Sequence, residues 1–175
     1  MTELVFLTTT DAVIFLQLLL SLILGMVLGL ERSIVGKRAG MRTFALVSIA
    51  SCLFVVLSEL ISARYLGIAD VNPLRVAAAI ITGIGFLGTG IIIFDKELKG
   101  LTTAASLWVT AGIGMSVGFG FYAIAIFTTC ITIFVFEVLW HVERFAAKHV
   151  RLPNLDDEPV VVESTEKKSN TINYD

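Results

Sequence analysis

The sequence contains little charge for its length. Charged residues make up 16% of the chain and hydrophobic residues 56%, and the net charge is −2. Soluble domains average about a quarter charged residues, so this composition argues against a water-soluble protein. No segment is basic enough to indicate nucleic-acid binding. We therefore expect the chain to lie in a lipid bilayer and not to bind nucleic acid.

Cysteine is also scarce, and the usual enzyme motifs are missing. Cys52 and Cys130 both lie inside apolar stretches, where we expect small buried hydrophobic side chains and no disulfide. The sequence has no Walker motif and no candidate for a catalytic triad. We expect neither an enzyme nor a bound cofactor.

Long apolar segments dominate what is present. A helix that crosses a bilayer needs about twenty mostly apolar residues. Five segments meet this requirement: residues 11–30, 41–63, 74–94, 101–117 and 119–140. The predicted fold class is an all-α integral membrane bundle of about five transmembrane helices. We divide the chain into an external N-terminus (1–10), the membrane domain (11–140), a basic juxtamembrane helix (141–152) and a polar, mostly disordered tail (153–175).

The positions of lysine and arginine predict the orientation of the bundle, because basic loops stay in the cytoplasm. One side has only Arg64 and Arg75 near the membrane. The other side has the remaining basic residues near the membrane: Arg32, Lys37, Arg38, Arg42, Lys96, Lys99, Arg144, Lys148 and Arg151. Five crossings with the N-terminus outside and the C-terminus inside satisfy this pattern. We expect a multi-pass protein of a bacterial inner membrane.

The predicted third helix lacks a side chain at four positions, which are glycines: Gly83, Gly85, Gly88 and Gly90. Three of them match the spacing GxGxxG, which binds dinucleotides only between a β-strand and a helix, so inside an apolar helix we discount it. The glycines let a neighbouring backbone approach closely, which is the interpretation we favour. Alternatively, they break the helix and expose carbonyls that bind an ion, as in transporters.

Small residues also follow one face of the fourth helix at a spacing of four, and the first helix contains a GxxxG pair. The two sets are Thr102, Ser106, Thr110, Gly114 and Gly118, and Gly25 and Gly29. Such faces allow close packing, so we expect the third and fourth helices to pack tightly, with the first nearby. The hydroxyls either line a polar path or, as is more common, bond their own backbone. The number of these faces also predicts self-association into homo-oligomers.

Charged residues at the membrane boundaries are candidates for a functional site. Glu31 and Arg32 end the first helix and Arg42 begins the second, so a short loop brings acid and base together. A defined network and ordinary flanking charge both stay open as explanations. No Asp or Glu lies in the middle of a predicted span, whereas Mg²⁺ prefers carboxylates and water. A self-contained magnesium pump is therefore not expected, although Mg²⁺ as a ligand or transported ion stays open because backbone carbonyls also bind ions.

Four segments of the chain occur together, in this order, in one bacterial family. They are GLER from Gly29 to Arg32, AGMRTFALVS from Ala39 to Ser48, NPLRVAAAIITGIGFLGTGIII from Asn72 to Ile93, and GLTTAASLWVTAGIG from Gly100 to Gly114. From Gly25 to Gly120 the chain resembles the transmembrane domain of the MgtC/SapB family. The resemblance implies an inner-membrane protein linked to magnesium homeostasis, and to growth and virulence when magnesium is scarce. The best-known members resemble regulators that bind other membrane proteins, including the F-type ATP synthase.

By the same resemblance, the residues at family-motif positions are the candidates for the functional site. They are Glu31, Arg32, Arg42, Thr43, Asn72, Pro73, Arg75, Gly83, Gly85, Gly88, Gly90, Gly100, Thr102, Thr103, Ser106 and Trp108. Two positions depart from the family pattern, since Asn72 stands where an acid is frequent and Ala79 where glutamine is frequent. Both changes remove polar groups that an ion would need. Many members also have a C-terminal soluble domain, which we do not expect here.

Two functions are compatible with these features. The first is a regulatory module that binds membrane protein partners through its glycine-rich helix faces. The alternative is a transporter or channel subunit for magnesium or another cation. The absence of acids from the predicted spans favours the first, because a magnesium path needs oxygen ligands of high charge.

Overall fold

The computed structural model of the chain describes residues 2–65, 72, 74–95, 97–139, 141, 142 and 145, with the backbone alone at 2–10 and 93–99. The chain forms two units, Met1–Leu139 and Trp140–Asp175. In the second unit the described residues are His141, Val142 and Phe145, which are helical and exposed. Pro73, most of the predicted juxtamembrane helix and the whole predicted tail lie outside the described residues.

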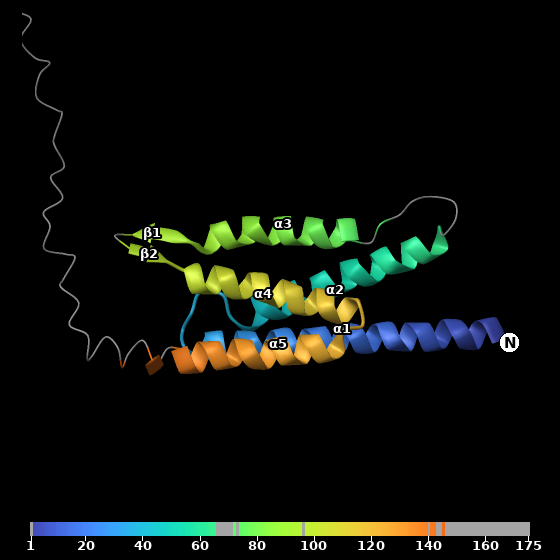
Figure 1. Cartoon of the computed structure of the whole chain (residues 1–175), viewed down its shortest axis with the longest axis horizontal. Coiled ribbons are helices and arrows are strands. Elements are labelled where there is room, and N and C mark those ends of the chain that lie inside the picture. Colours follow the sequence, from blue (N-terminus) through green and yellow to red (C-terminus); the bar gives the residue numbers. More distant parts are fainter. Residues whose placement is uncertain are drawn as a thin grey trace, which may run out of the picture. The chain divides into compact units, whose positions relative to one another are not determined.

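The first unit is a bundle of helices that lie lengthwise along one another (Figure 1). Its described part contains α1 (Thr2–Ile34), α2 (Met41–Arg64), α3 (Leu74–Ile91), α4 (Leu101–Gly118) and α5 (Tyr122–Phe134), which continues into one π turn, Val135–Leu139. Within these residues, five helical segments are long and apolar enough to cross a membrane. The expected all-α membrane fold is therefore confirmed, while the predicted orientation of the termini stays a prediction.

The third helix ends earlier than the sequence predicted. α3 stops at Ile91, and the next residues form a two-stranded antiparallel hairpin, β1 (Ile93–Asp95) and β2 (Glu97–Lys99), in which Ile93 lies opposite Lys99. Consecutive isoleucines favour extended backbone, and the charged residues that follow are costly inside an apolar layer. Across Gly83, Gly85, Gly88 and Gly90 the helix is continuous. The broken helix considered for ion binding is therefore absent from this structure.

Two glycine faces, one on α1 and one on α4, pack on α2. A Cβ atom added at Gly29 would lie 2.5 Å from the Cα of Met41, and one at Gly25 would lie 2.7 Å from the carbonyl oxygen of Phe44. On α4, a Cβ at Gly118 would lie 2.9 Å from the carbonyl oxygen of Cys52. These distances are shorter than any normal contact, so only glycine allows α1 and α4 to come so close to α2.

The predicted pairing of helices is corrected in one respect. α3 does pack on α4, where a Cβ at Gly88 would be 3.5 Å from the Cβ of Ala104. The tight glycine contacts of α4, however, face α2 and not α3. Small residues mark a face that accepts a close neighbour, but they do not say which neighbour it is.

Candidate functional site

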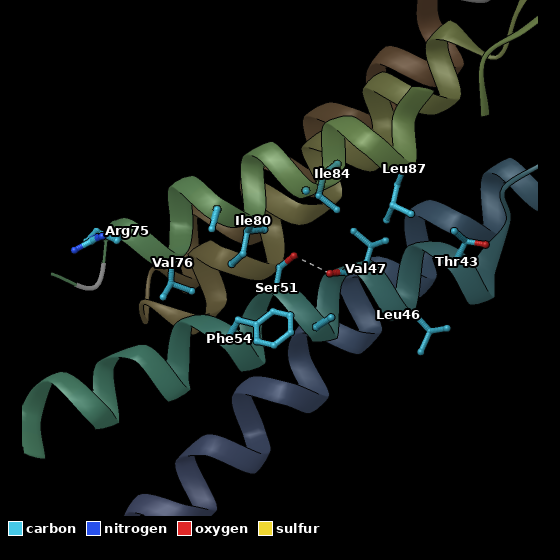
Figure 2. A pocket seen from close by; sticks show the side chains of 13 residues that line it. Thr43, Leu46, Val47, Ser51, Phe54, Arg75, Val76, Ile80, Ile84 and Leu87 are labelled. Carbon is cyan, nitrogen blue, oxygen red and sulfur yellow. Dashed lines mark hydrogen bonds between the residues drawn. The ribbon is translucent and has the colours of Figure 1, made fainter. Parts of the chain in front are cut away.

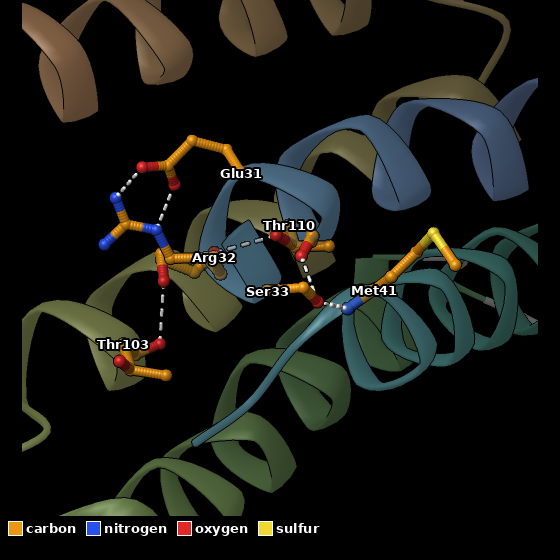
Figure 3. Close-up of polar contacts among 8 residues, drawn as sticks. Glu31, Arg32, Ser33, Met41, Thr103 and Thr110 are labelled. Atoms are coloured by element: carbon orange, nitrogen blue, oxygen red, sulfur yellow. Dashed lines mark hydrogen bonds and ion pairs between the residues drawn. The ribbon is translucent and has the colours of Figure 1, made fainter. Parts of the chain in front are cut away.

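The charged end of α1 forms a buried ion pair. The guanidinium of Arg32 donates from Nε and Nη2 to both carboxylate oxygens of Glu31, and the second of these bonds is 2.6 Å long. The two side chains are only 6% and 13% exposed (Figure 3). A bidentate bond between a guanidinium and a carboxylate is among the strongest pairings available to side chains. Glu31 is therefore engaged by its neighbour and is not a free carboxylate.

The π turn after α5 provides a second contact for the same arginine. The guanidinium carbon of Arg32 lies 3.6 Å from the centre of the Phe136 ring, which is itself buried. The face of an aromatic ring attracts a cation, and more strongly where water is excluded. This contact connects the end of α1 to the end of α5.

The turn between α1 and α2 is held by Ser33. Its hydroxyl donates to the carbonyl oxygen of Gly29 and accepts from the backbone N–H of Met41, with both distances 2.9 Å (Figure 3). The second bond satisfies an N–H at the start of α2 that has no partner within the helix. Arg42, predicted as part of the same network, is exposed and makes no ion pair with a described side chain. The structure thus brings Glu31 and Arg32 together and leaves Arg42 outside.

The start of α4 carries a second group of the predicted residues. Gly100 precedes the helix with φ of +97°, a conformation that favours glycine. Thr103 and Ser106 are buried, whereas Thr102 and Trp108 are exposed. The hydroxyl of Ser106 donates to the carbonyl oxygen of Thr103, and that of Thr110 to the carbonyl oxygen of Ser106, both at 2.8 Å. These hydroxyls bond their own helix, so they do not form a continuous polar path.

An apolar groove runs between α2 and α3. Its volume is about 790 Å³, with Thr43 at one end and Arg75 at the other (Figure 2). Apolar side chains of α3, among them Val76, Ile80 and Leu87, point into it toward α2 (Figure 2). Most ligand sites in proteins have this character, a largely apolar cavity with a few polar groups at fixed places.

Most glycines of α3 have no neighbour in the bundle. A Cβ added at Gly83, Gly85 or Gly90 would meet nothing within 4 Å. Only 11% of the apolar stretch of α3 is buried inside the protein, against 50% for α2. Asn72 lies two residues before the start of this helix, and its Oδ1 accepts from the N–H of Leu74 at 2.9 Å. An aspartate can accept the same kind of bond at a helix start. Packing within the described chain therefore explains Gly88 but not Gly83, Gly85 and Gly90.

Comparison with known proteins places this arrangement in a family. The MgtC family model matches residues 18–145. The chain belongs to the MgtC family. It is thus a multi-pass membrane protein of this family, and the shared region contains the ion pair, the groove and the start of α4.

Several relatives align with most of the chain. They are YhiD of Escherichia coli K12, provisionally named a magnesium transporter (41% identical over 130 residues), protein MgtC of Brucella abortus (42% over 112) and protein SapB of Bacillus subtilis (36% over 119). The alignments cover 73%, 63% and 64% of this chain, but only 60%, 44% and 50% of those proteins. No solved structure matches the chain.

Sequence reasoning missed the roles of three residues that hold this MgtC-family fold together. No sequence pattern points to Ser33 or Phe136, because a lone serine or a lone phenylalanine near a helix end is common. Gln17 did give one, since it is an amide deep inside a predicted span. Its Nε2 donates to the carbonyl oxygens of Val117 at 3.2 Å and Gly118 at 3.4 Å. Such a side chain is costly in a bilayer unless it has a partner.

Proposed function

We propose that this MgtC-family protein is a regulatory protein of the bacterial inner membrane that binds a transmembrane helix of another membrane protein along α3. The observation that supports the proposal most directly is the empty space beside Gly83, Gly85 and Gly90. The proposed role is binding alone and includes no catalytic step.

Exposed apolar side chains do not distinguish a docking face in a membrane protein, because lipid tails cover them equally well. Glycines, which have no side chain, do distinguish a docking face. Gly83 and Gly90 are seven residues apart and so share one face of α3, where the missing Cβ atoms let another helix approach the backbone closely. Van der Waals packing at such a face is better than lipid tails provide. Gly25, Gly29, Gly114 and Gly118 are used in this way inside the bundle, so the unused glycines of α3 indicate a partner from outside.

Arg75 indicates a second property that the partner helix should have. It lies at one end of the groove, is exposed, and makes no ion pair with a described side chain. The predicted topology places this end at the outer surface of the membrane. We therefore expect an apolar partner helix that carries an aspartate or glutamate near its outer end, where the charge would pair with Arg75.

A photocrosslinking experiment tests the proposal in cells. A photoreactive phenylalanine analogue replaces Phe86, which is 80% exposed on α3, and mass spectrometry identifies the crosslinked peptide. We expect a transmembrane peptide of another membrane protein, and the F-type ATP synthase is the first candidate because of the family resemblance. Crosslinks to lipid alone, or to a second copy of this chain, would overturn the proposal.

Matched glycine variants separate docking from folding. Gly83→Leu and Gly90→Leu fill the empty face of α3, and Gly112→Leu fills an equally empty position on α4. We expect the first two to lose the crosslink while the third keeps it, with all three equally abundant and equally stable in detergent. An equal yield of crosslink from all three variants would remove α3 from the interface.

Magnesium transport is a second candidate because of the provisional name of the relative YhiD. Two features weigh against it. Glu31 is paired with Arg32, and in the part of the chain that the structure describes no three His, Cys, Asp or Glu side chains gather where they could hold a metal ion. Influx into liposomes that contain a magnesium-sensitive dye decides the matter. Influx above that of empty liposomes, and lost in Glu31→Gln, would favour transport over partner binding.

A further inference from the structure

A small cavity lies between the α1–α2 turn and the start of α4. Its volume is about 310 Å³, and its lining includes Lys37 and Arg38 from the turn and Thr102 and Thr103 from the first turn of α4. Gly36 and Gly100, which have φ of +73° and +97°, also line it. Glycine at these positions allows the two backbones to turn sharply beside the cavity. The cavity is separate from the α2–α3 groove.

The charges around this cavity are unbalanced. Lys37 and Arg38 are exposed, and neither makes an ion pair with a described side chain. The nearest acid in the turn, Glu31, is bound to Arg32. The hairpin that precedes α4 holds Asp95, Lys96, Glu97 and Lys99 and so contributes no net charge. The cavity therefore has an excess of positive charge that nothing in the described chain neutralises.

The start of α4 adds hydrogen-bond donors. The first bond within this helix runs from the N–H of Ala104 to the carbonyl oxygen of Gly100 at 2.9 Å, so the three preceding N–H groups have no acceptor in the helix. No side chain caps this end, and its first turn has no acidic residue. Free N–H groups and the helix dipole together favour an anion at such an end.

Thr103 is the observation that points to a ligand independently of the helix end. It is 4% exposed and lines the cavity, and its hydroxyl makes no hydrogen bond with any of the described residues. Ser106 and Thr110, the other buried hydroxyls of α4, both donate to a carbonyl oxygen. A hydroxyl that lines a cavity and has no partner among the described residues is free to donate to, or accept from, a group that enters it.

From these features we infer that the cavity binds a phosphate group. A phosphate has acceptor oxygens in several directions, which suits an arginine, a lysine, two hydroxyls and free N–H groups that converge from two segments. The predicted topology places the cavity at the cytoplasmic surface. Two sources then offer the same chemistry, the headgroup of an anionic phospholipid in the inner leaflet and a soluble phosphate compound. The inference does not depend on the proposed partner helix.

Binding measurements on the purified full chain test this site. Inorganic phosphate is titrated by calorimetry into protein in a neutral detergent, and thermal stability is compared in nanodiscs of phosphatidylcholine with and without phosphatidylglycerol. Binding of free phosphate identifies a soluble ligand. Stabilisation by phosphatidylglycerol alone, with that lipid retained on purification, identifies a headgroup. The absence of both effects overturns the inference.

Three variants locate the binding. Thr103→Val removes only the hydroxyl, and we expect it to weaken the binding found above about tenfold, the usual loss for one hydrogen bond to a charged group. The double variant Lys37→Gln/Arg38→Gln is expected to weaken it about a hundredfold. Arg42→Gln is the control, because Arg42 is an exposed arginine at the same end that does not line the cavity. If Arg42→Gln weakens binding as much as the double variant, or if Thr103→Val has no effect, the site is wrong.

Discussion

The contact between α4 and α2 gives the sharpest prediction about stability. A Cβ added at Gly114 would overlap the carbonyl oxygen of Ser48 and would lie 2.9 Å from its carbonyl carbon and 3.0 Å from its Cα. Non-bonded carbon atoms prefer about 3.5–4.0 Å, so in Gly114→Ala the two helices must separate by about 0.5–1 Å. A gap of that size loses roughly a quarter to a half of the dispersion energy of the facing atoms.

The cost of this substitution should lie at the upper end of the usual range. Overpacking costs about 1–3 kcal/mol, and less where a flexible side chain can move away. At Gly114 the three nearest atoms all belong to the backbone of Ser48, so no rotamer change relieves the clash. We therefore expect Gly114→Ala to lower the free energy of unfolding by about 3 kcal/mol.

Unfolding in mixed micelles measures this difference. The protein in a mild detergent is titrated with SDS, and helix content is followed by circular dichroism. Gly112→Ala is the matched control, because it lies on the same helix and its added Cβ would meet nothing within 4 Å. Alanine is also the better helix former by up to about 1 kcal/mol, so this control should be neutral or slightly stabilised. Equal stability of the two variants would refute the close contact of α4 with α2.

Three further predictions follow from other contacts in the bundle. Gln17→Leu removes the donor to two carbonyl oxygens of α4 and should cost about 1 kcal/mol in the same titration, whereas a neutral result would show that the bonds do not form in the bilayer. Arg32→Ala leaves the Glu31 carboxylate buried without its partner and should lower the free energy of unfolding by about 3–5 kcal/mol. Adding Glu31→Gln to the same chain should restore part of this loss. A loss no larger than that of Arg42→Ala would contradict the buried pair. Gly100→Ala forces a side chain into a left-handed conformation 2.6 Å from the carbonyl oxygen of Ile91 and should lower the unfolding midpoint more than Gly120→Ala, which has a similar φ but open space.

The sequence predicted the helices well because a bilayer imposes one strong rule. A span must be helical, apolar and about twenty residues long, and the predicted ranges 41–63 and 101–117 differ from α2 and α4 by a single residue at the end. The end of α3 was wrong because isoleucine is equally apolar in a helix and in a strand. Hydropathy therefore does not show that Ile93 leaves the helix.

The candidate site was predicted less completely. The pairing of Glu31 with Arg32 follows from their adjacency, and glycine faces are visible as spacing in the sequence. The partner of each face is not visible, because Gly114 and Gly88 have similar surroundings in sequence, yet one meets α2 and the other α4. Thr103 could not be separated from Ser106 either, since whether a helical hydroxyl bonds its own backbone depends on the residues around it.

The bonds donated by Gln17 have a consequence for how the protein is made. α1 is synthesised first and α4 much later, yet the amide of α1 satisfies the carbonyl oxygens where α4 ends. When the hairpin of α4 and α5 enters the bilayer, the side-chain amide of Gln17, which is its hydrogen-bond donor, is therefore already present. A fragment that begins after α1 would have to insert this hairpin without the side-chain donor that the carbonyl oxygen of Gly118 has in the full chain, whereas the carbonyl oxygen of Val117 also accepts from the N–H of Gly120. The N-terminal helix thus acts as an internal assembly factor for the C-terminal half.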